Sequence, residues 1–544
     1  MHSRRLTAAV AVSAVLALAL AACGTGSSSS SSGGPANPDG IVSIGIGEPQ
    51  HLLPSNATDT NAYQALVGLF EPLITFDKDS KPVMAQAQSV ETKDGIFWTI
   101  KLKPGYTFTD GTPVTAQDYV NAWNYAAYGP NGQATNYYFS TIKGYADMNP
   151  ADPKATPKAK TLSGLKAADD LTLQVTMSQP YIGFSTAIGY TAFLPLPKAA
   201  FDSNGAVKAG FEDHMIGDGP FKLTAAGWQH NKEIDMVRND TFAGTKPKIG
   251  GVNLKSYLSL STAYQDVLSD KLDVLPQLAT SDLGTAQADF GDRYQHSPMS
   301  AFQFLAFPTY EKDFSNVNVR KAISMAIDRD AQVKVIFDNS QTSARSFVSP
   351  VVPGYRPDVC GEACQYNPSA AKQLYDANNG PKVIQITYNA DGGHKEWVEA
   401  TCNELQTNLG VQCTAKPEAK FADLLTKVEA KTPGVGMFRL GWVMDYPSME
   451  DYLGPLYTTH GSSNYYGYSN LQFDKLVAEG NAQSTLEAAI AKWQQAEDIL
   501  AKDMPVVPMR FGQNNFVFSN FVKNVTVDLF SAVDLNTITT SRNS

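Results

Sequence analysis

The sequence lacks the features that identify several large classes of protein. It has no run of Lys and Arg in 544 residues, and its formal net charge of −10 argues against a nucleic-acid partner. It contains no G-x-S-x-G, H-E-x-x-H or P-loop pattern, and its seven His residues are scattered. We therefore expect no enzyme, and we expect neither a cofactor nor a metal site.

Long apolar runs are also scarce, and the one that occurs lies at the N-terminus. The basic start MHSRR precedes residues 6–22, which carry no charge and are typical of a signal peptide. This run is shorter than the roughly 20 residues that a membrane span needs. It ends in Leu-Ala-Ala-Cys23, which resembles the lipobox of bacterial lipoproteins. The alternative is an ordinary signal peptide with an incidental cysteine.

The lipobox reading places the mature protein outside the cytoplasm. Residues 1–22 are predicted to be removed, and Cys23 is predicted to be lipidated. The Ser- and Gly-rich residues 23–40 are then a flexible tether, which spans on the order of 20–25 Å as a coil. We expect a folded body held by this lipid anchor at the outer face of the bacterial cell membrane.

Cysteine is rare, with five residues in the chain. Apart from Cys23 they number four, and an even number in an exported chain favours disulfides. Three pairings are possible; we favour Cys360–Cys364 and Cys402–Cys413, because each closes a short loop. A zinc site is a weaker reading, since CGEAC has no second cysteine pair at zinc spacing and no His cluster near it.

Segments with the periodicity of strands and of helices alternate along the rest of the chain. Residues 41–49 and 96–102 are predicted strands, the second with alternating apolar residues. Thr115, with Asp118 three residues later, predicts a capped helix start. A further helix is predicted to end at Gly410, and the longest to begin near Ser484. Such interleaving favours α/β domains.

Five segments, in order, resemble one family: the large extracytoplasmic solute-binding proteins of peptide-type ABC importers. Each matches a characteristic run of that family, and together they extend over nearly the whole mature chain. The segments are FWTIKLKPGYTFTDGTPVTAQDYVNAWNYA (97–126), GDGPFKLTAAGW with VRND (217–240), VRKAISMAIDRD (319–330), GWVMDYPSMEDYLGPLY (441–457) and YSNLQFDKL (468–476).

The resemblance implies an α/β fold of the periplasmic-binding-protein type (type II, large cluster C), with two hinged lobes and an inserted domain. It places lobe I at residues 41–68, 213–308 and 525–544. The inserted domain II is expected at 69–212 and lobe III at 309–524. The expected partners are a peptide ligand and the permease subunits of the importer, with the protein itself a monomer.

The same resemblance assigns the binding residues. In oligopeptide-binding members, an Asp of the G-W-x-x-D segment pairs with the ligand α-amino group, which here is Asp445. Arg439 is the candidate for the ligand carboxylate. The backbone from Gly441 through Trp442 to Val443 is expected to pair with the peptide backbone. Trp442 and Tyr446 are expected to line side-chain pockets, and Tyr138 is a candidate lid contact. The family's Asp-Pro after the Tyr is here Pro447-Ser448, which puts the local loop shape in doubt.

Two other functions within the same architecture remain open at this point. Relatives of the family take up nickel complexes, opines or oligosaccharides; a nickel site would need a convergent His or Arg, and a sugar site would not need Asp445. A receptor for peptide signals is the other alternative.

Overall fold

The structure is a computed structural model and describes residues 34–77, 79–150, 152 and 154–543. The predicted signal peptide and Cys23 lie outside these residues. Asn37 donates from its backbone N–H to the carbonyl of Thr540 at 2.7 Å, and Arg238 donates to the carbonyl of Pro38 at 2.6 Å. Hydrogen bonding to the body therefore already includes the last residues of the predicted tether.

One large mixed sheet forms the frame of the described residues. Its path runs in the order β15 (Gln412–Glu418), β14 (Val383–Asn389), β16 (Met437–Trp442), β12 (Tyr294–Ala306), β17 (Val506–Phe518), β11 (Val274–Leu275), β1 (Ile41–Ile46), β10 (Gly251–Ser256), β9 (Glu233–Arg238) and β8 (Phe221–Gln229), and β13 (Thr342–Ser343) pairs with β17. The strands β14, β15 and β16 are parallel to one another, whereas β12 is antiparallel to both β16 and β17.

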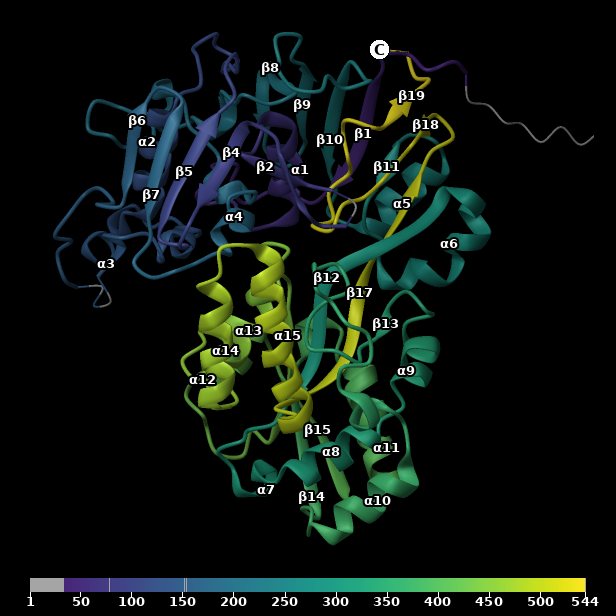
Figure 1. The fold of residues 1–544 in the computed structure, drawn as a ribbon. Coiled ribbons are helices and arrows are strands. Elements are labelled where there is room, and N and C mark those ends of the chain that lie inside the picture. Colours follow the sequence, from purple (N-terminus) through teal and green to yellow (C-terminus); the bar gives the residue numbers. More distant parts are fainter. Residues whose placement is uncertain (1–33, 78, 151, 153, 544) are drawn as a thin grey trace, which may run out of the picture. The chain divides into compact units, whose positions relative to one another are not determined.

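Strands β12 and β17 run side by side and join the two halves of this sheet (Figure 1). Their ladder extends from Tyr294 opposite Val517 to Ala306 opposite Val506, with a register shift between Pro298 and Phe302. Pro298 has no N–H to donate, and such irregularities let a strand bend and twist locally. The connection between the halves is therefore a two-stranded ribbon with an irregular middle.

A separate four-stranded antiparallel sheet lies within the predicted inserted domain. Its order is β4 (Ala87–Thr92), β5 (Phe97–Leu102), β7 (Thr172–Thr176) and β6 (Leu165–Asp169). The remaining strands form two small pairs, β2 (Ile74–Phe76) with β3 (Pro82–Met84) and β18 (Val522–Lys523) with β19 (Thr539–Thr540).

Helices pack around these sheets. The longer ones are α1 (Thr60–Leu69), α2 (Ala116–Ala127), α5 (Leu260–Leu268), α6 (Leu283–Phe290), α8 (Val317–Met325), α9 (Arg329–Ile336), α10 (Pro368–Ala377), α11 (Lys395–Leu409), α12 (Phe421–Glu429), α13 (Glu450–Tyr457), α14 (Leu471–Asn481) and α15 (Leu486–Asp503). The short ones are α3 (Tyr145–Met148), α4 (Phe184–Ala187) and α7 (Lys312–Ser315).

Most of the predicted helix ends agree with the structure, and one does not. Thr115 caps α2, with its backbone N–H donating to the Asp118 carboxylate at 2.8 Å. Gly410 ends α11 in the left-handed conformation, as predicted. The prediction of Ser484 as the start of α15 is wrong by one residue. The extended Thr485 is the cap, and its hydroxyl accepts from the N–H of Ala488 at 3.2 Å.

Both predicted disulfides are present, and both lie within the segment predicted as lobe III. Cys360 is bonded to Cys364, and Cys402 is bonded to Cys413, with Cα atoms 5.7 Å and 5.1 Å apart. The second bond ties α11 to the edge strand β15, so it secures the end of the sheet that carries β14 and β16.

The GDGP motif has a packing role. A Cβ atom on Gly219 would lie 2.4 Å from the backbone nitrogen of Phe70, and the N–H of Gly219 donates to the carbonyl of Leu69 at 2.9 Å. Between the two glycines, Asp218 is 1% exposed and accepts from Gln86 at 2.7 Å. The motif therefore fixes the end of α1 at the entrance to the inserted domain.

Gly219→Ala should lower the free energy of unfolding by about 1–3 kcal/mol, because the new methyl group overlaps backbone that cannot move aside. Urea denaturation measures this change. Gly284→Ala is the control: Gly284 is exposed on α6, and a methyl group added there would meet nothing within 4 Å, so stability should stay level or rise slightly. Equal stabilities of the two variants would contradict this role for Gly219.

Candidate functional site

Strand β16 presents one unpaired edge at the predicted binding segment. On one side Gly441 and Trp442 pair with Gln303 and Phe302 of β12. On the other side the ladder with β14 ends at Phe438, so within the described residues no strand covers the rest of that edge. Backbone N–H and C=O groups on an open strand edge are able to pair with an added strand.

The turn that follows β16 is held by Asp451, which the sequence analysis did not single out. One oxygen of its carboxylate, Oδ2, accepts from the indole N–H of Trp442 at 3.1 Å and from the backbone N–H of Asp445 at 2.9 Å. Asp451 lies in the first turn of α13 and is 3% exposed. Because Asp451 fixes the turn, the side chain of Asp445 is not needed to cap it.

Tyrosines of the predicted inserted domain face Asp445. Burial, followed by the nearby charge of Asp445, raises the pKa values of Tyr137, Tyr138 and Tyr190, that of Tyr190 to about 12. The rings are stacked in sequence, with centroids 4.4 Å apart between Tyr137 and Tyr138 and 4.8 Å between Tyr138 and Tyr190. The charge of Asp445 therefore acts on Tyr138, another predicted site residue, while the enclosed hydroxyl of Tyr138 has no hydrogen-bond partner among the described residues.

Negative charge accumulates around this turn. Burial raises the pKa of Asp445 to about 6, while the hydroxyls of Tyr138 and Tyr137 act in the opposite direction. Burial, and then the charge of Asp445, raises the pKa of Asp451 well above its ordinary value. Burial also raises the pKa of Glu450. Among the described residues, the causes of the pKa shifts of Asp445 and Glu450 are burial and neighbouring tyrosine and asparagine side chains, with no basic side chain among them.

Tyr446 connects two parts of the chain. Its hydroxyl accepts from Tyr181 at 2.5 Å and donates to Oε2 of Glu450 at 2.5 Å. Tyr446 is 8% exposed, whereas Val443 is 51% exposed. The predicted pocket-lining role of Tyr446 stays a prediction, and the structure adds that this side chain links α13 to the segment of Tyr181.

Arg439 lies over the sheet near the carboxyl ends of β14 and β16. Its two terminal nitrogens donate to the amide oxygens of Asn389 and Gln303, both at 2.9 Å, and its guanidinium lies 5.7 Å from the ring centre of Phe421. A Cβ atom on Gly441 would lie 2.5 Å from Nε2 of Gln303. A glycine at 441 therefore leaves room for the amide that holds Arg439.

A comparison with known protein families shows which family the chain belongs to. The sequence model described as bacterial extracellular solute-binding proteins, family 5 Middle, matches residues 80–464. The chain belongs to this family. It is therefore the solute-binding part of a transport system rather than an enzyme, and family members work outside the cytoplasm.

Relatives of this solute-binding protein cover most of its length. The oligopeptide-binding protein OppA of Bacillus subtilis is 26% identical over 494 residues, which are 88% of each chain. The periplasmic oligopeptide-binding protein OppA of Escherichia coli is 27% identical over 462 residues, 82% of each chain. The unliganded open form of MppA, a periplasmic murein tripeptide-binding protein, has a TM-score of 0.81 at 23% identity, over 94% of this chain and 99% of MppA. The fold is that of a type II periplasmic binding protein with two lobes.

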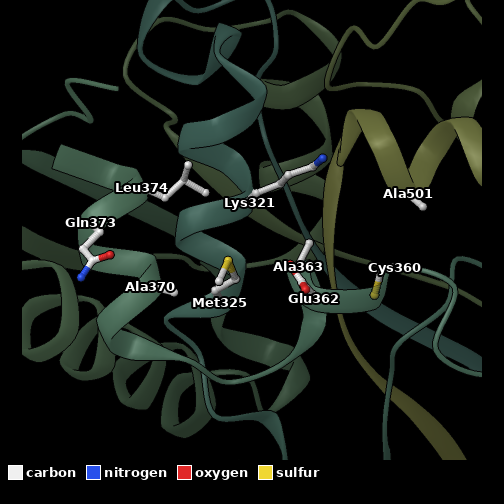
Figure 2. A pocket seen from close by; sticks show the side chains of 9 residues that line it. All are labelled: Lys321, Met325, Cys360, Glu362, Ala363, Ala370, Gln373, Leu374 and Ala501. Carbon is white, nitrogen blue, oxygen red and sulfur yellow. The ribbon is translucent and has the colours of Figure 1, made fainter. Parts of the chain in front are cut away.

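A groove elsewhere on the solute-binding protein is separate from this site. It has a volume of about 650 Å³ and lies between α8, α10 and the Cys360–Cys364 loop. Figure 2 shows Lys321 and Met325 of α8 beside Ala370 and Leu374 of α10. None of the predicted binding residues lines it. Within the described part of the chain no group of His, Cys, Asp or Glu could hold a metal ion, and no helix has both the length and the apolar character of a bilayer span.

Four residues that surround the predicted ones were not predicted from the sequence. Glu450 and Asp451 carried one signal, since two adjacent acids interrupt an apolar and aromatic segment. Gln303 and Asn389 carried none, because a neutral amide in a strand looks like any other polar residue until the strands are paired.

Asp445→Asn should stabilise the solute-binding protein at pH 8 by on the order of 1 kcal/mol. A carboxyl whose pKa rises to about 6 on folding favours the folded state fully below about pH 4 and loses that contribution as pH passes 6. Because the Asn side chain cannot ionise, the free energy of unfolding of the variant should increase relative to that of the wild type between pH 5 and pH 8. Urea denaturation at several pH values measures the difference.

Asp147→Asn, at an exposed position of α3, serves as the control and should follow the wild type at every pH. A stability difference between Asp445→Asn and the wild type that is the same at pH 5 and pH 8 would contradict the raised pKa.

Proposed function

We propose that this protein captures peptides between its two lobes and delivers them to the permease of an ABC importer. Curated relatives carry peptide-binding names, among them oligopeptide-binding OppA and dipeptide-binding DppE of Bacillus subtilis. A structural neighbour, OppA of Haemophilus influenzae, forms a complex with the peptide RPPGFSPFR; its TM-score is 0.69 at 22% identity. These names support peptides as the class of ligand.

The observation that carries the proposal is the open edge of β16 beside the buried carboxylate of Asp445, on whose pKa no basic side chain of the described residues acts. A peptide that pairs with the backbone from Gly441 to Val443 adds a strand to the sheet, and this form of binding does not depend on peptide side chains. Such a strand runs directly toward Asp445, which follows two residues after Val443. The backbone pairing therefore provides affinity for a peptide whatever its side chains, and Asp445 fixes the direction in which the peptide is bound.

Each terminus of the peptide pairs with a side chain of the opposite charge. The α-ammonium pairs with Asp445 and relieves the repulsion between Asp445 and Asp451. Arg439 is the candidate partner of the carboxylate. Six residues of extended chain span about 20 Å, so Arg439 and Asp445 reach one short peptide only because the chain turns after Trp442.

Closure of the lobes completes the proposed mechanism. Strands β12 and β17 form the hinge, and bending is easiest at the register shift between Pro298 and Phe302. In the closed form Tyr138 covers the ligand from the inserted domain at 69–212. Lobe I is assigned to 41–68, 213–308 and 525–544, and lobe III to 309–524. The closed monomer then docks on the permease, held near it by the lipid on Cys23.

Asp445→Asn should weaken binding of a free tripeptide such as Ala-Ala-Ala by about 2–5 kcal/mol, because the buried ammonium loses its anionic partner. N-acetylation of the same peptide removes the ammonium and should weaken binding to the wild type. The variant should bind the free and the acetylated peptides with nearly equal affinity. Isothermal titration calorimetry on all four combinations gives the coupling directly.

Asp423→Asn, an exposed acid on α12, is the control for loss of one negative charge. It should bind both peptides as the wild type does. If Asp445→Asn keeps the full preference of the wild type for the free ammonium, Asp445 is not the anchor.

Cys23→Ser should release the protein from the membrane fraction when it is expressed with its own leader, since the serine hydroxyl does not form the thioether to the lipid. Fractionation followed by immunoblotting measures the distribution, and Cys360→Ser is the control for loss of a cysteine elsewhere. A Cys23→Ser protein that stays with the membrane would argue against the lipid anchor.

A further inference from the structure

Arg510 of β17 is a buried cation that has no role in the proposed function. It is 5% exposed, and its guanidinium carbon lies 4.3 Å from the ring centre of Phe337 and 4.6 Å from that of Trp397. Its Nε atom is enclosed and has no hydrogen-bond partner. In the part of the chain that the structure describes, no carboxylate pairs with this side chain.

Two other buried arginines of the predicted lobe III, Arg320 and Arg329, have oxygen acceptors for their N–H groups. Arg320 is 6% exposed and donates to the carbonyls of Phe314, Ser315 and Met504 at 2.8–2.9 Å. Arg329 is 3% exposed and donates to the carbonyl of Pro508 at 2.5 Å and to the hydroxyl of Ser324 at 2.6 Å. These two arginines are structural, since carbonyl and hydroxyl oxygens satisfy their N–H groups. Among the described residues, Arg510 has aromatic faces around it but no oxygen acceptor for its Nε atom.

The position of Arg510 places it in the candidate site. In the sheet, Gly441 lies opposite Gln303, and Gln303 lies opposite Arg510, so the three form one row across β16, β12 and β17. Directly opposed residues project from the same face of an antiparallel pair. Gln303 accepts from Arg439 at 2.9 Å, and hence Arg439 and Arg510 lie on either side of the same amide.

The surroundings of Arg510 favour an anion. Burial first, and then the charge of Arg439, lowers the pKa of Arg510 to about 9, the direction expected for a buried cation beside a second cation. Trp397 belongs to the first turn of α11, so the positive end of that helix dipole points to the same corner. The row of Gly441, Gln303 and Arg510 also ends near the carboxyl ends of β14 and β16, and ligand sites of α/β sheets form at such strand ends.

We propose that Arg510 binds a second carboxylate of the ligand, so that the site prefers peptides whose C-terminal residue is acidic. This inference rests on the proposed function, in which Arg439 meets the terminal carboxylate. An acidic side chain on that last residue then supplies the anion that Arg510 lacks. Guanidinium and carboxylate form two parallel charge-assisted bonds, and the flanking rings hold the guanidinium plane in place.

The test compares Ala-Ala-Glu with Ala-Ala-Gln, which are nearly the same size and differ by one negative charge. By isothermal titration calorimetry the wild type should bind the Glu peptide at least about tenfold more tightly, the range expected for hydrogen bonds to a charged group. Arg510→Met, whose unbranched apolar side chain fits between two rings, should bind both peptides with about equal affinity. Its affinity for the Gln peptide should stay within about threefold of the wild type.

Lys334→Met is the matched control, because it removes one positive charge from an exposed position of α9, the helix whose C-cap is Phe337. It should keep the full preference for the Glu peptide. Arg510→Lys keeps the charge but loses the planar pair of donors, and it should retain part of the preference.

The outcomes separate this inference from the proposed function. If the wild type binds both peptides without preferring Glu, or if Arg510→Met keeps the preference, the role of Arg510 is overturned while the peptide function stands. If neither peptide binds the wild type, the peptide function fails and the inference fails with it. The wild-type comparison decides the matter even if Arg510→Met does not fold.

Discussion

The site depends on one constraint: charges removed from water need partners, and here like charges are gathered at two places beside the same strand. Beyond the end of β16, Asp445, Glu450 and Asp451 lie together in buried surroundings that raise their pKa values, and no basic side chain contributes to the pKa of Asp445 or Glu450 in the described part of the chain. Over the sheet, Arg439 and Arg510 lie on either side of Gln303. In the proposed function, the ammonium of a peptide pairs with Asp445, and a carboxylate on its last side chain pairs with Arg510.

The rest of the fold holds these two charged places in register. Strand β16 carries Arg439 and leads into the turn of Asp445, and Asp451 fixes that turn through Trp442. Strand β12 pairs with β16 on one side and with β17 on the other, so it sets the distance between the two arginines. Arg510 lies on β17, one of the two strands of the proposed hinge, and Arg439 lies on β16, which pairs with the other hinge strand, β12.

The prediction of the fold from sequence succeeded where a short motif has a local physical cause. The Thr115–Asp118 pair predicted the start of α2, and Gly410 predicted the end of α11. The short loops between cysteines favoured the disulfides that the structure contains. Ser484 was wrong by one residue, because Ser and Thr are both good caps and the backbone conformation of Thr485 decided between them. The two-lobed fold itself came from the family resemblance and not from periodicity.

The candidate site was predictable only in part. Asp445, Arg439 and Trp442 were predicted from one contiguous family motif and Tyr138 from a run of three aromatic residues, and their binding roles stay predictions. The sequence by itself determined the caps, the short-range disulfides and the residues of that motif, since all of these act between neighbours in the chain. Tertiary structure alone decided which charges have partners. Arg510 meets Phe337 and Trp397 from separate helical regions, and strand pairing over long range places it where no carboxylate of the described residues pairs with it, which no local pattern records.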